Sequence, residues 1–181
     1  MNKVVIIGSP GSGKSSFAVK IARQTGLPLI HLDRLYWKPG WEKTPVEAWV
    51  PLVEKQTKGE AWIIDGNYQS TLELRIAAAD TVIFLDMPRW ICLCRVVKRR
   101  FANLGKTRPD MGPDCPEKLD QEFFLFLKFV WNFEKISGAP LRALMDRYRE
   151  GRDMTVLKSP KEVRDYLLTL STVKSGTSTS E

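Results

Sequence analysis

The stretch GSPGSGKS, at positions 8–15, matches the pattern GxxxxGK(S/T) at every fixed position. An apolar run at residues 4–7 precedes it and predicts a short buried strand, and residues 14–24 predict a helix. In this context the backbone N–H groups of the loop and the positive end of the helix converge on a space the size of one anion. A glycine turn that only joins a strand to a helix needs no lysine. The sequence therefore predicts a phosphate-binding loop, made of Gly8, Ser9, Pro10, Gly11, Ser12, Gly13, Lys14, Ser15 and Ser16.

The side chains at the end of this loop indicate its ligand. Lys14 is placed to reach the β- and γ-phosphates of a nucleoside triphosphate, and the hydroxyl of Ser15 is placed to hold a magnesium ion. We therefore expect ATP and Mg²⁺ to bind here.

Strand and helix patterns alternate along the rest of the chain. The near-continuous apolar runs suit parallel strands that helices cover on both faces. The predicted strands are residues 3–7, 28–32, 61–65, 81–86 and 154–157. A chain of 181 residues, 43% of them hydrophobic, can bury one core of this α/β type. We expect a single P-loop NTPase domain over residues 1–170, with a lid and lid-adjacent helices at about 95–140, and a disordered tail at residues 171–181.

Local signals add detail to this outline. The S/T-x-x-E pattern of a helix start occurs at Thr44, Ser70 and Ser159. Residues 103–117 hold three prolines, two glycines and no periodicity, and they predict an exposed loop. Residues 119–136 predict a helix with almost no polar face, which the lid and core, a second copy of the chain or a membrane surface must cover. We therefore expect a monomer or a homodimer.

Composition bears on the compartment. No run approaches the roughly 20 apolar residues that span a membrane, and the N-terminus lacks the pattern of a signal peptide. Three cysteines and a lone histidine, His31, indicate neither a disulfide framework nor a zinc site. We expect a cytoplasmic protein.

The formal charge of +7 is concentrated in residues 89–108, which hold seven cations and no acidic residue. Helical spacing puts Arg95 and Arg99 one turn apart, so both can contact one ligand. Together with Arg108 from the following loop, they could stack on a base or bind phosphate oxygens. A lid that closes over a nucleotide needs this charge, and so does a DNA-binding face, so charge alone does not choose between them.

Three aspartates stand at the ends of predicted strands, where ligands gather in an α/β sheet. Asp33 follows the second strand, Asp65 ends the third and Asp86 ends the fourth. Asp65 fits a magnesium-binding role, because a hydrophobic strand that ends in aspartate is typical of the Walker B motif. The alternative is a carboxylate that caps the turn at Gly66.

The stretch HLDRLYW, at positions 31–37, brings acidic, basic and aromatic residues together. Asp33 could orient or deprotonate an acceptor hydroxyl, and Arg34 could hold an anion. Tyr36 and Trp37 could stack on a ring of the acceptor. The alternative is that the aromatic residues only pack this segment onto the core. For His31, a position near a strand end favours a structural role.

These motifs together resemble those of adenylate kinase and related small kinases, and in particular the adenylate-kinase-like bacterial proteins labelled DNA topology modulation proteins. The resemblance covers residues 1–170 and rests on HLD and YW in residues 31–37, DGNY at 65–68, RPDM at 108–111 and CPEK at 115–118. It implies a five-stranded parallel sheet of order 2-3-1-4-5, with helices on both faces and a helical lid insertion. It also implies that Arg95 stacks on adenine and Arg99 contacts phosphate. By the same resemblance, Lys158 and Pro160 border the adenine.

One departure leaves the acceptor open. Adenylate kinases follow Asp-Gly with Phe-Pro-Arg, whose arginine holds the AMP phosphate, whereas this chain has GNYQ at residues 66–69. Arg75 or Arg34 could take over that role. The aspartate at position 33 resembles that of shikimate and nucleoside kinases, in which it binds an acceptor hydroxyl. The expected acceptor-binding residues are Asp33, Arg34, Tyr36, Trp37, Gly66, Asn67, Tyr68, Arg75 and Arg108.

The sequence thus predicts a phosphotransferase that moves the γ-phosphoryl group of ATP to a small hydroxyl-bearing or nucleotide acceptor. The expected catalytic residues are Lys14, Asp33, Arg95 and Arg99. Two alternatives are a nucleotide-dependent protein that binds DNA and modulates its topology, and an ATP-binding switch with slow ATPase activity.

Overall fold

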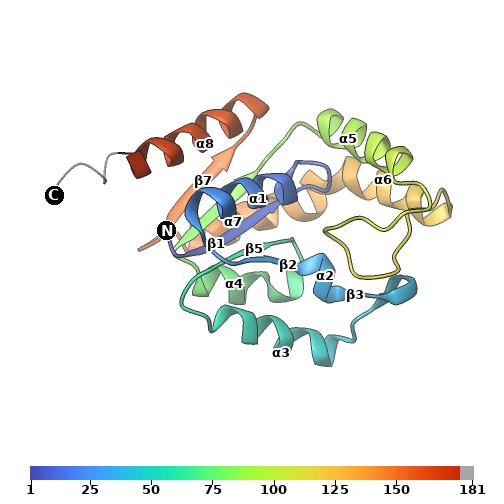
Figure 1. Cartoon of the computed structure of the whole chain (residues 1–181), viewed down its shortest axis with the longest axis horizontal. Coiled ribbons are helices and arrows are strands. Elements are labelled where there is room, and N and C mark those ends of the chain that lie inside the picture. Colours follow the sequence, from blue (N-terminus) through green and yellow to red (C-terminus); the bar gives the residue numbers. More distant parts are fainter. Residues whose placement is uncertain (176–181) are drawn as a thin grey trace.

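The computed structural model describes the backbone of residues 1–175 and the side chains of residues 1–171. Its centre is a parallel sheet of five strands in the order β2-β5-β1-β6-β7 (Figure 1). The strands are β1 (Lys3–Gly8), β2 (Leu29–His31), β5 (Trp62–Asp65), β6 (Thr81–Leu85) and β7 (Asp153–Leu157). Counted along the chain, this is the order 2-3-1-4-5, so the predicted fold class and strand order are confirmed.

The register of the sheet brings the ends of the strands to one edge. Asp65 of β5 pairs with Ile6 of β1 on one side and with His31 of β2 on the other. Gly8, the last residue of β1, pairs with Leu85 of β6. The phosphate-binding loop therefore begins at the same carboxyl edge of the sheet at which two of the predicted aspartates, Asp65 and Asp86, lie.

Helices cover both faces of the sheet, as the apolar strands require (Figure 1). Alternate residues of each strand point to opposite faces, so Val4 and Ile6 join one core cluster while Val5 and Ile7 join the other. The first cluster includes residues of α1 (Lys14–Thr25), α5 (Arg89–Ala102) and α8 (Pro160–Ser175). The second includes residues of α3 (Val46–Thr57), α4 (Leu72–Ala78) and α7 (Ala139–Arg147).

The predicted apolar helix is present as α6 (Gln121–Phe133), which packs against α5 and continues through a π-helical turn (Glu134–Gly138) into α7. Phe123, Val130 and Phe133 are buried, whereas Phe124 and Leu125 are 66% and 60% exposed. One face of α6 is therefore covered within the chain and another faces outward, which leaves the predicted second copy untested.

The segment after β2 forms a small projection beside the sheet. It consists of α2 (Leu32–Tyr36) and a hairpin of β3 (Trp37–Lys38) and β4 (Glu42–Lys43), which the short helical turn Pro39–Trp41 joins. A second short helical turn, Gln69–Thr71, follows β5. The loop of residues 103–117 folds back onto this hairpin, where the indole N–H of Trp41 donates to the carbonyl of Pro116 at 2.9 Å. Within the loop, Met111, Cys115 and Glu117 are buried.

The prediction of an exposed loop was therefore wrong for much of residues 103–117. Gly112 shows how closely the loop approaches the hairpin, because a Cβ atom there would lie 1.9 Å from the carbonyl oxygen of Trp37. The sequence pattern of prolines and glycines reports irregular backbone but not burial, which here depends on a hairpin some 70 residues away in the sequence.

Of the three predicted helix starts, one is confirmed. Ser159 and Glu162 exchange the expected hydrogen bonds at the start of α8. The hydroxyl of Thr44 instead donates to the carbonyl of Tyr36, and Thr71 rather than Ser70 precedes α4. Local patterns mark a helix start correctly only where no tertiary partner competes for the same side chain.

Helix α8 continues to Ser175, so residues 171–175 are helical and not part of a tail as predicted, while residues 176–181 lie outside the described part of the chain. Among the described residues, no helix combines the length and apolar character needed to cross a membrane.

Candidate active site

The phosphate-binding loop curls tightly between β1 and α1. Gly11 and Gly13 have φ angles of 80° and 100°, which favour glycine. A side chain at Gly11 would also collide with the carbonyl oxygen of Cys92 on α5, 2.3 Å from the position of its Cβ atom. Lys14 reaches back across the loop and donates from Nζ to the carbonyl oxygen of Ser9 at 3.0 Å. The pKa of Lys14 is lowered, chiefly by burial, although Asp65 and Asp33 act in the opposite direction.

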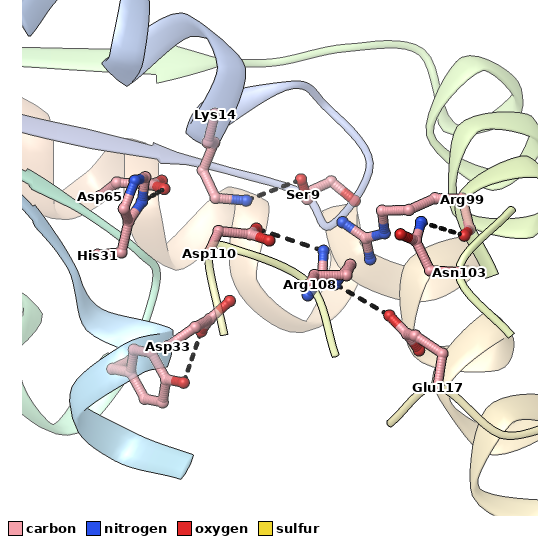
Figure 2. Close-up of polar contacts among 11 residues, drawn as sticks. Ser9, Lys14, His31, Asp33, Asp65, Arg99, Asn103, Arg108, Asp110 and Glu117 are labelled. Carbon is pink, nitrogen blue, oxygen red and sulfur yellow. Dashed lines mark hydrogen bonds and ion pairs between the residues drawn. The ribbon is translucent and has the colours of Figure 1, made fainter. Parts of the chain in front are cut away.

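A cavity of about 680 Å³ opens beside this loop. It is lined by groups from the phosphate loop, from the ends of β2 and β5, from α5 and from the loop of residues 103–117. The predicted site residues that line it are Pro10, Gly11, Lys14, Ser15, Asp33, Trp37, Asp65, Gly66, Asn67, Tyr68, Arg99 and Arg108. Figure 2 shows several of these side chains directed toward a common region.

Asp65 is only 5% exposed and lies at the end of β5. Its Oδ2 accepts a hydrogen bond from Nδ1 of His31 at 3.0 Å, and this bond is the main cause of the raised pKa of His31. Its Oδ1 is buried with no hydrogen-bond partner among the residues that the structure describes. The N–H of Gly66 donates to the carbonyl of Ile6, so the hydrogen bonds give no support to a cap by Asp65 on this turn.

This arrangement fits a magnesium ion. A buried carboxylate oxygen without a donor is costly unless a cation or water satisfies it. The hydroxyl-bearing Ser15 lines the same cavity, and oxygen ligands of these two types are the ones that magnesium prefers. His31 orients the carboxylate in the way that outer-sphere partners commonly do at metal sites.

Asp33 lies on α2, where the chain leaves β2, and is half-buried at the wall of the cavity. Its Oδ1 accepts a hydrogen bond of 2.6 Å from the hydroxyl of Tyr68. Burial raises the pKa of Asp33, and the hydrogen bond from Tyr68 opposes this rise. A carboxylate of this kind is a strong acceptor for a hydroxyl group.

Asn67 joins the acceptor side of the cavity to the phosphate loop. Its side-chain oxygen accepts from the N–H of Gly8 at 3.0 Å, and its side-chain N–H donates to the carbonyl of Gly8 at 2.6 Å. No local pattern predicts this double hydrogen bond between Asn67 and Gly8, because the two residues are 59 positions apart.

The structure gives no support to the prediction that Arg75 binds an acceptor anion. Its side chain is fully buried, and its guanidinium donates to the carbonyl oxygens of Gly66 and Asn67 at 2.8 and 2.6 Å and also to those of Tyr68 and Thr71. Burial lowers its pKa to about 9. Arg75 therefore holds the segment after β5 in shape, and a sequence alone does not distinguish this use of arginine from anion binding.

Two further predicted acceptor residues lie outside the cavity. Arg34 is exposed and does not line it. The ring of Tyr36 packs against those of Trp37, Trp49 and Tyr68, at centroid distances of 4.6–5.1 Å. The packing alternative therefore holds for Tyr36, whereas Trp37 lines the cavity.

The cations of the basic segment are divided between solvent and the site. Arg99 and Arg100 are half-buried and Arg108 is buried, whereas the exposed ones are Arg89, Arg95, Lys98 and Lys106. Arg95 donates from Nη1 to the carbonyl of Ser12 at 3.0 Å, and Arg99 lines the cavity with its pKa lowered to about 10, chiefly by burial and then by Arg108. Arg100 and Arg108 share the carboxylate of Glu117, at N···O distances of 2.6 and 2.9 Å. The sequence did not predict the role of Glu117. It is the first buried acidic residue after the basic segment, and its burial appears only in the folded chain.

The two residues predicted to border adenine lie elsewhere. Lys158 lines a separate cavity of about 490 Å³, which also touches Ser9 and Asp86, and Pro160 is the first residue of α8. Their contact with a nucleotide stays a prediction.

Comparisons with known proteins agree with this fold. A family model described as isopentenyl transferase matches residues 1–39, the part that holds the phosphate loop and Asp33. No curated protein sequence matches the chain. Among solved structures, shikimate kinase from Acinetobacter baumannii in complex with shikimate is similar with a TM-score of 0.57 and 15% identity, over 99% of this chain and 96% of that one. The chain therefore has the P-loop fold that shikimate kinase shares.

Proposed function

We propose that this protein is an ATP-dependent phosphotransferase that moves the γ-phosphoryl group onto a hydroxyl group of a small molecule. The observation that carries the proposal is a single cavity that joins the phosphate loop, through Lys14 and Ser15, to the carboxylate of Asp33. A transferase needs both sites open to one space, because donor and acceptor oxygens must approach each other in line.

The residues divide the work according to their positions. The loop N–H groups and Lys14 hold the phosphates, and Arg99 neutralises charge on the transferring group. Asp33 accepts a hydrogen bond from the acceptor hydroxyl, which aligns its oxygen for attack and draws off the proton. Magnesium, held by Ser15 and through water by Asp65, supplies further neutralisation of the phosphate oxygens when it is bound.

Exclusion of water is the remaining requirement, because water would otherwise accept the phosphoryl group. The loop of residues 103–117 closes one side of the cavity with Met111 and Arg108, and the hairpin closes another with Trp37 and Trp41. This packed cover supports transfer to an acceptor over the slow ATPase alternative.

The comparisons support the same class of reaction. The similar solved structure is a shikimate kinase in complex with shikimate. The match to an isopentenyl transferase model is limited to 39 residues, and a phosphate-binding loop followed by an acceptor residue suits a diphosphate donor of either kind. We therefore include a prenyl diphosphate as a second donor in the test below.

The direction of the basic side chains argues against the DNA-binding alternative. Of the seven cations in residues 89–108, Arg95 bonds to the phosphate loop, Arg99 lines the cavity, and Arg100 and Arg108 pair with Glu117. Arg99, Arg100 and Arg108 are therefore not part of a solvated face that could follow a phosphate backbone. The cations that stay exposed are Arg89, Arg95, Lys98 and Lys106. The label of DNA topology modulation thus gains no support from the structure.

The proposal is tested by incubating the protein with γ-labelled ATP, Mg²⁺ and a metabolite extract from bacterial cytoplasm, the compartment in which we expect it to act. We expect a new phosphorylated compound with the wild type, and at least about a hundredfold less with Lys14→Ala. Lys20→Ala is the matched control, because Lys20 is exposed on the same helix. Release of inorganic phosphate alone, or label transfer that survives in Lys14→Ala, contradicts the assignment. Transfer from a labelled prenyl diphosphate but not from ATP would replace it with prenyl transfer.

A further inference from the structure

We infer that the acceptor is a hydroxyl compound that carries no anionic group, bound at its hydroxyl by Asp33 and along its face by the aromatic wall of Trp37 and Trp41. This inference rests on the proposed function and names the class of its second substrate. It follows from an account of every arginine that was a candidate for holding an acceptor anion.

None of those arginines offers a free guanidinium to the acceptor side in the part of the chain that the structure describes. Arg34 is exposed and does not line the cavity, and Arg75 donates four hydrogen bonds to main-chain carbonyl groups. Arg100 and Arg108 are both paired with Glu117, and Arg108 also lies 3.3 Å from Asp110 (Figure 2 shows Arg108 between its two partners).

The remaining cations of the cavity belong to its phosphate side or its rim. Arg99 lines the cavity together with Pro10, Gly11 and Lys14 of the phosphate loop, and we assign it to the phosphate side. Lys118 is exposed at the rim, where Asp120 and Glu122 also line the cavity. Apart from Lys14 and Arg99, which we assign to the phosphates, and Lys118 at the rim, the described cations of the cavity are therefore paired with a carboxylate.

The total charge leads to the same conclusion. The cavity is lined by six carboxylates and five cationic side chains before any ligand binds. A nucleoside triphosphate with its magnesium ion adds further negative charge. A phosphate or carboxylate group on the acceptor would then be repelled, since too few cations remain to compensate it.

The walls offer apolar contact in place of charge. The rings of Trp37 and Trp41 lie 5.3 Å apart, and Trp41 is fixed by its hydrogen bond to Pro116. Phe126 and Phe129 of α6 line the same cavity. Aromatic faces of this kind bind flat rings or the apolar face of a sugar.

The inference is tested by separating a metabolite extract on an anion exchanger at neutral pH. The flow-through contains neutral and cationic compounds, and the bound fraction contains anions. Each fraction is incubated with the wild type, γ-labelled ATP and Mg²⁺, and labelled products are identified by mass spectrometry. We expect the product from the flow-through, lost in Lys14→Ala and at least about a hundredfold reduced in Asp33→Asn.

The outcomes separate the inference from the function on which it rests. A product from the bound fraction, or a higher yield per acceptor there, overturns the acceptor class but leaves the phosphotransferase intact. No product from either fraction overturns both.

A second variant tests the charge argument directly. Glu117→Gln removes the carboxylate that occupies Arg100 and Arg108, so we expect at least about tenfold more label in compounds of the bound fraction. Glu47→Gln, exposed on α3 and not among the residues that line the cavity, is the matched control and should leave both yields unchanged. A Glu117→Gln protein that melts like the wild type and shows no such gain would contradict the charge argument.

Discussion

At the scale of single residues, the environment of Asp33 makes its carboxyl group harder to ionise and its carboxylate a stronger base. Burial raises the pKa of this carboxyl group, because the charged form loses contact with water. The hydroxyl of Tyr68 donates to it and lowers the pKa again in part. The balance leaves a carboxylate with a strengthened affinity for a proton, which suits a group that takes one from an acceptor hydroxyl.

The first prediction concerns this pair. Asp33→Asn should lower kcat by about 10²–10⁴-fold with little change in the KM for ATP, because the amide cannot take the proton. In the wild type, kcat should fall as the pH is lowered through a pKa above that of an ordinary aspartate. Tyr68→Phe keeps the ring but removes the donor, so the acidic limb should move to higher pH. Steady-state pH profiles of the three proteins measure this, and an unmoved limb in Tyr68→Phe would contradict it.

The sequence predicts the position of a single residue well where a backbone motif determines it. Lys14 and Ser15 were placed correctly beside the cavity because the loop pattern determines where they point. It does not distinguish the role of Arg75, because burial on carbonyl groups and binding of a ligand use the same guanidinium chemistry. Only the folded chain shows which of the two partners is present.

At the scale of elements, two irregular segments carry most of the site. The segment after β5 is held by Arg75 from α4, and the loop of residues 103–117 is held by the hairpin of β3 and β4. The strands and long helices were predicted well, since their patterns are local. The folding of the loop was not, because its burial arises from contacts distant in sequence.

The second prediction tests the structural role of Arg75. Arg75→Met should lower the free energy of unfolding by at least about 3 kcal/mol, because it leaves several buried carbonyl groups without a donor. Arg34→Met, on the exposed side of α2, should change it by less than about 0.5 kcal/mol. Urea denaturation of both variants measures the difference. Equal, small losses would mean that the carbonyl groups find other partners.

The third prediction concerns the close contact at Gly112. Gly112→Ala should displace the loop from Trp37, at a cost of about 1–3 kcal/mol, because the new methyl group has no space. Faster tryptic cleavage at Lys106 and a raised acceptor KM should accompany it. Gly59→Ala, outside the loop, is the control, since a Cβ atom there would lie no closer than 3.5 Å to its neighbours. If both variants are cleaved at the same rate, the contact with Trp37 does not hold the loop.

At the scale of the whole molecule, the sequence predicts the fold class and strand order, whereas it leaves the identity of the acceptor open. Alternating strands and helices after a phosphate loop leave few topologies open. The acceptor side depends instead on which charges pair with which, and Glu117 meets Arg108 only after the chain has folded. The seven cations of residues 89–108 did not by themselves distinguish a lid over a nucleotide from a DNA-binding face. The structure pairs Arg100 with Glu117 and bonds Arg95 to a carbonyl group of the phosphate loop.

The fourth prediction uses the stability of the whole chain as a readout of nucleotide binding. At a hundred times its Kd, ATP with Mg²⁺ should stabilise the protein by about 2.7 kcal/mol, which for this size raises the Tm by roughly 5–10 °C. Lys14→Ala should lose most of that shift and Lys20→Ala should retain it. Thermal melts with and without nucleotide measure this. An identical shift in all three proteins would show that the nucleotide binds away from the loop.

The double hydrogen bond between Asn67 and Gly8 has a mechanical consequence. It joins the phosphate loop, which starts at Gly8, to the segment after β5 that lines the acceptor side. These two parts of the catalytic centre are therefore expected to keep a fixed separation during turnover.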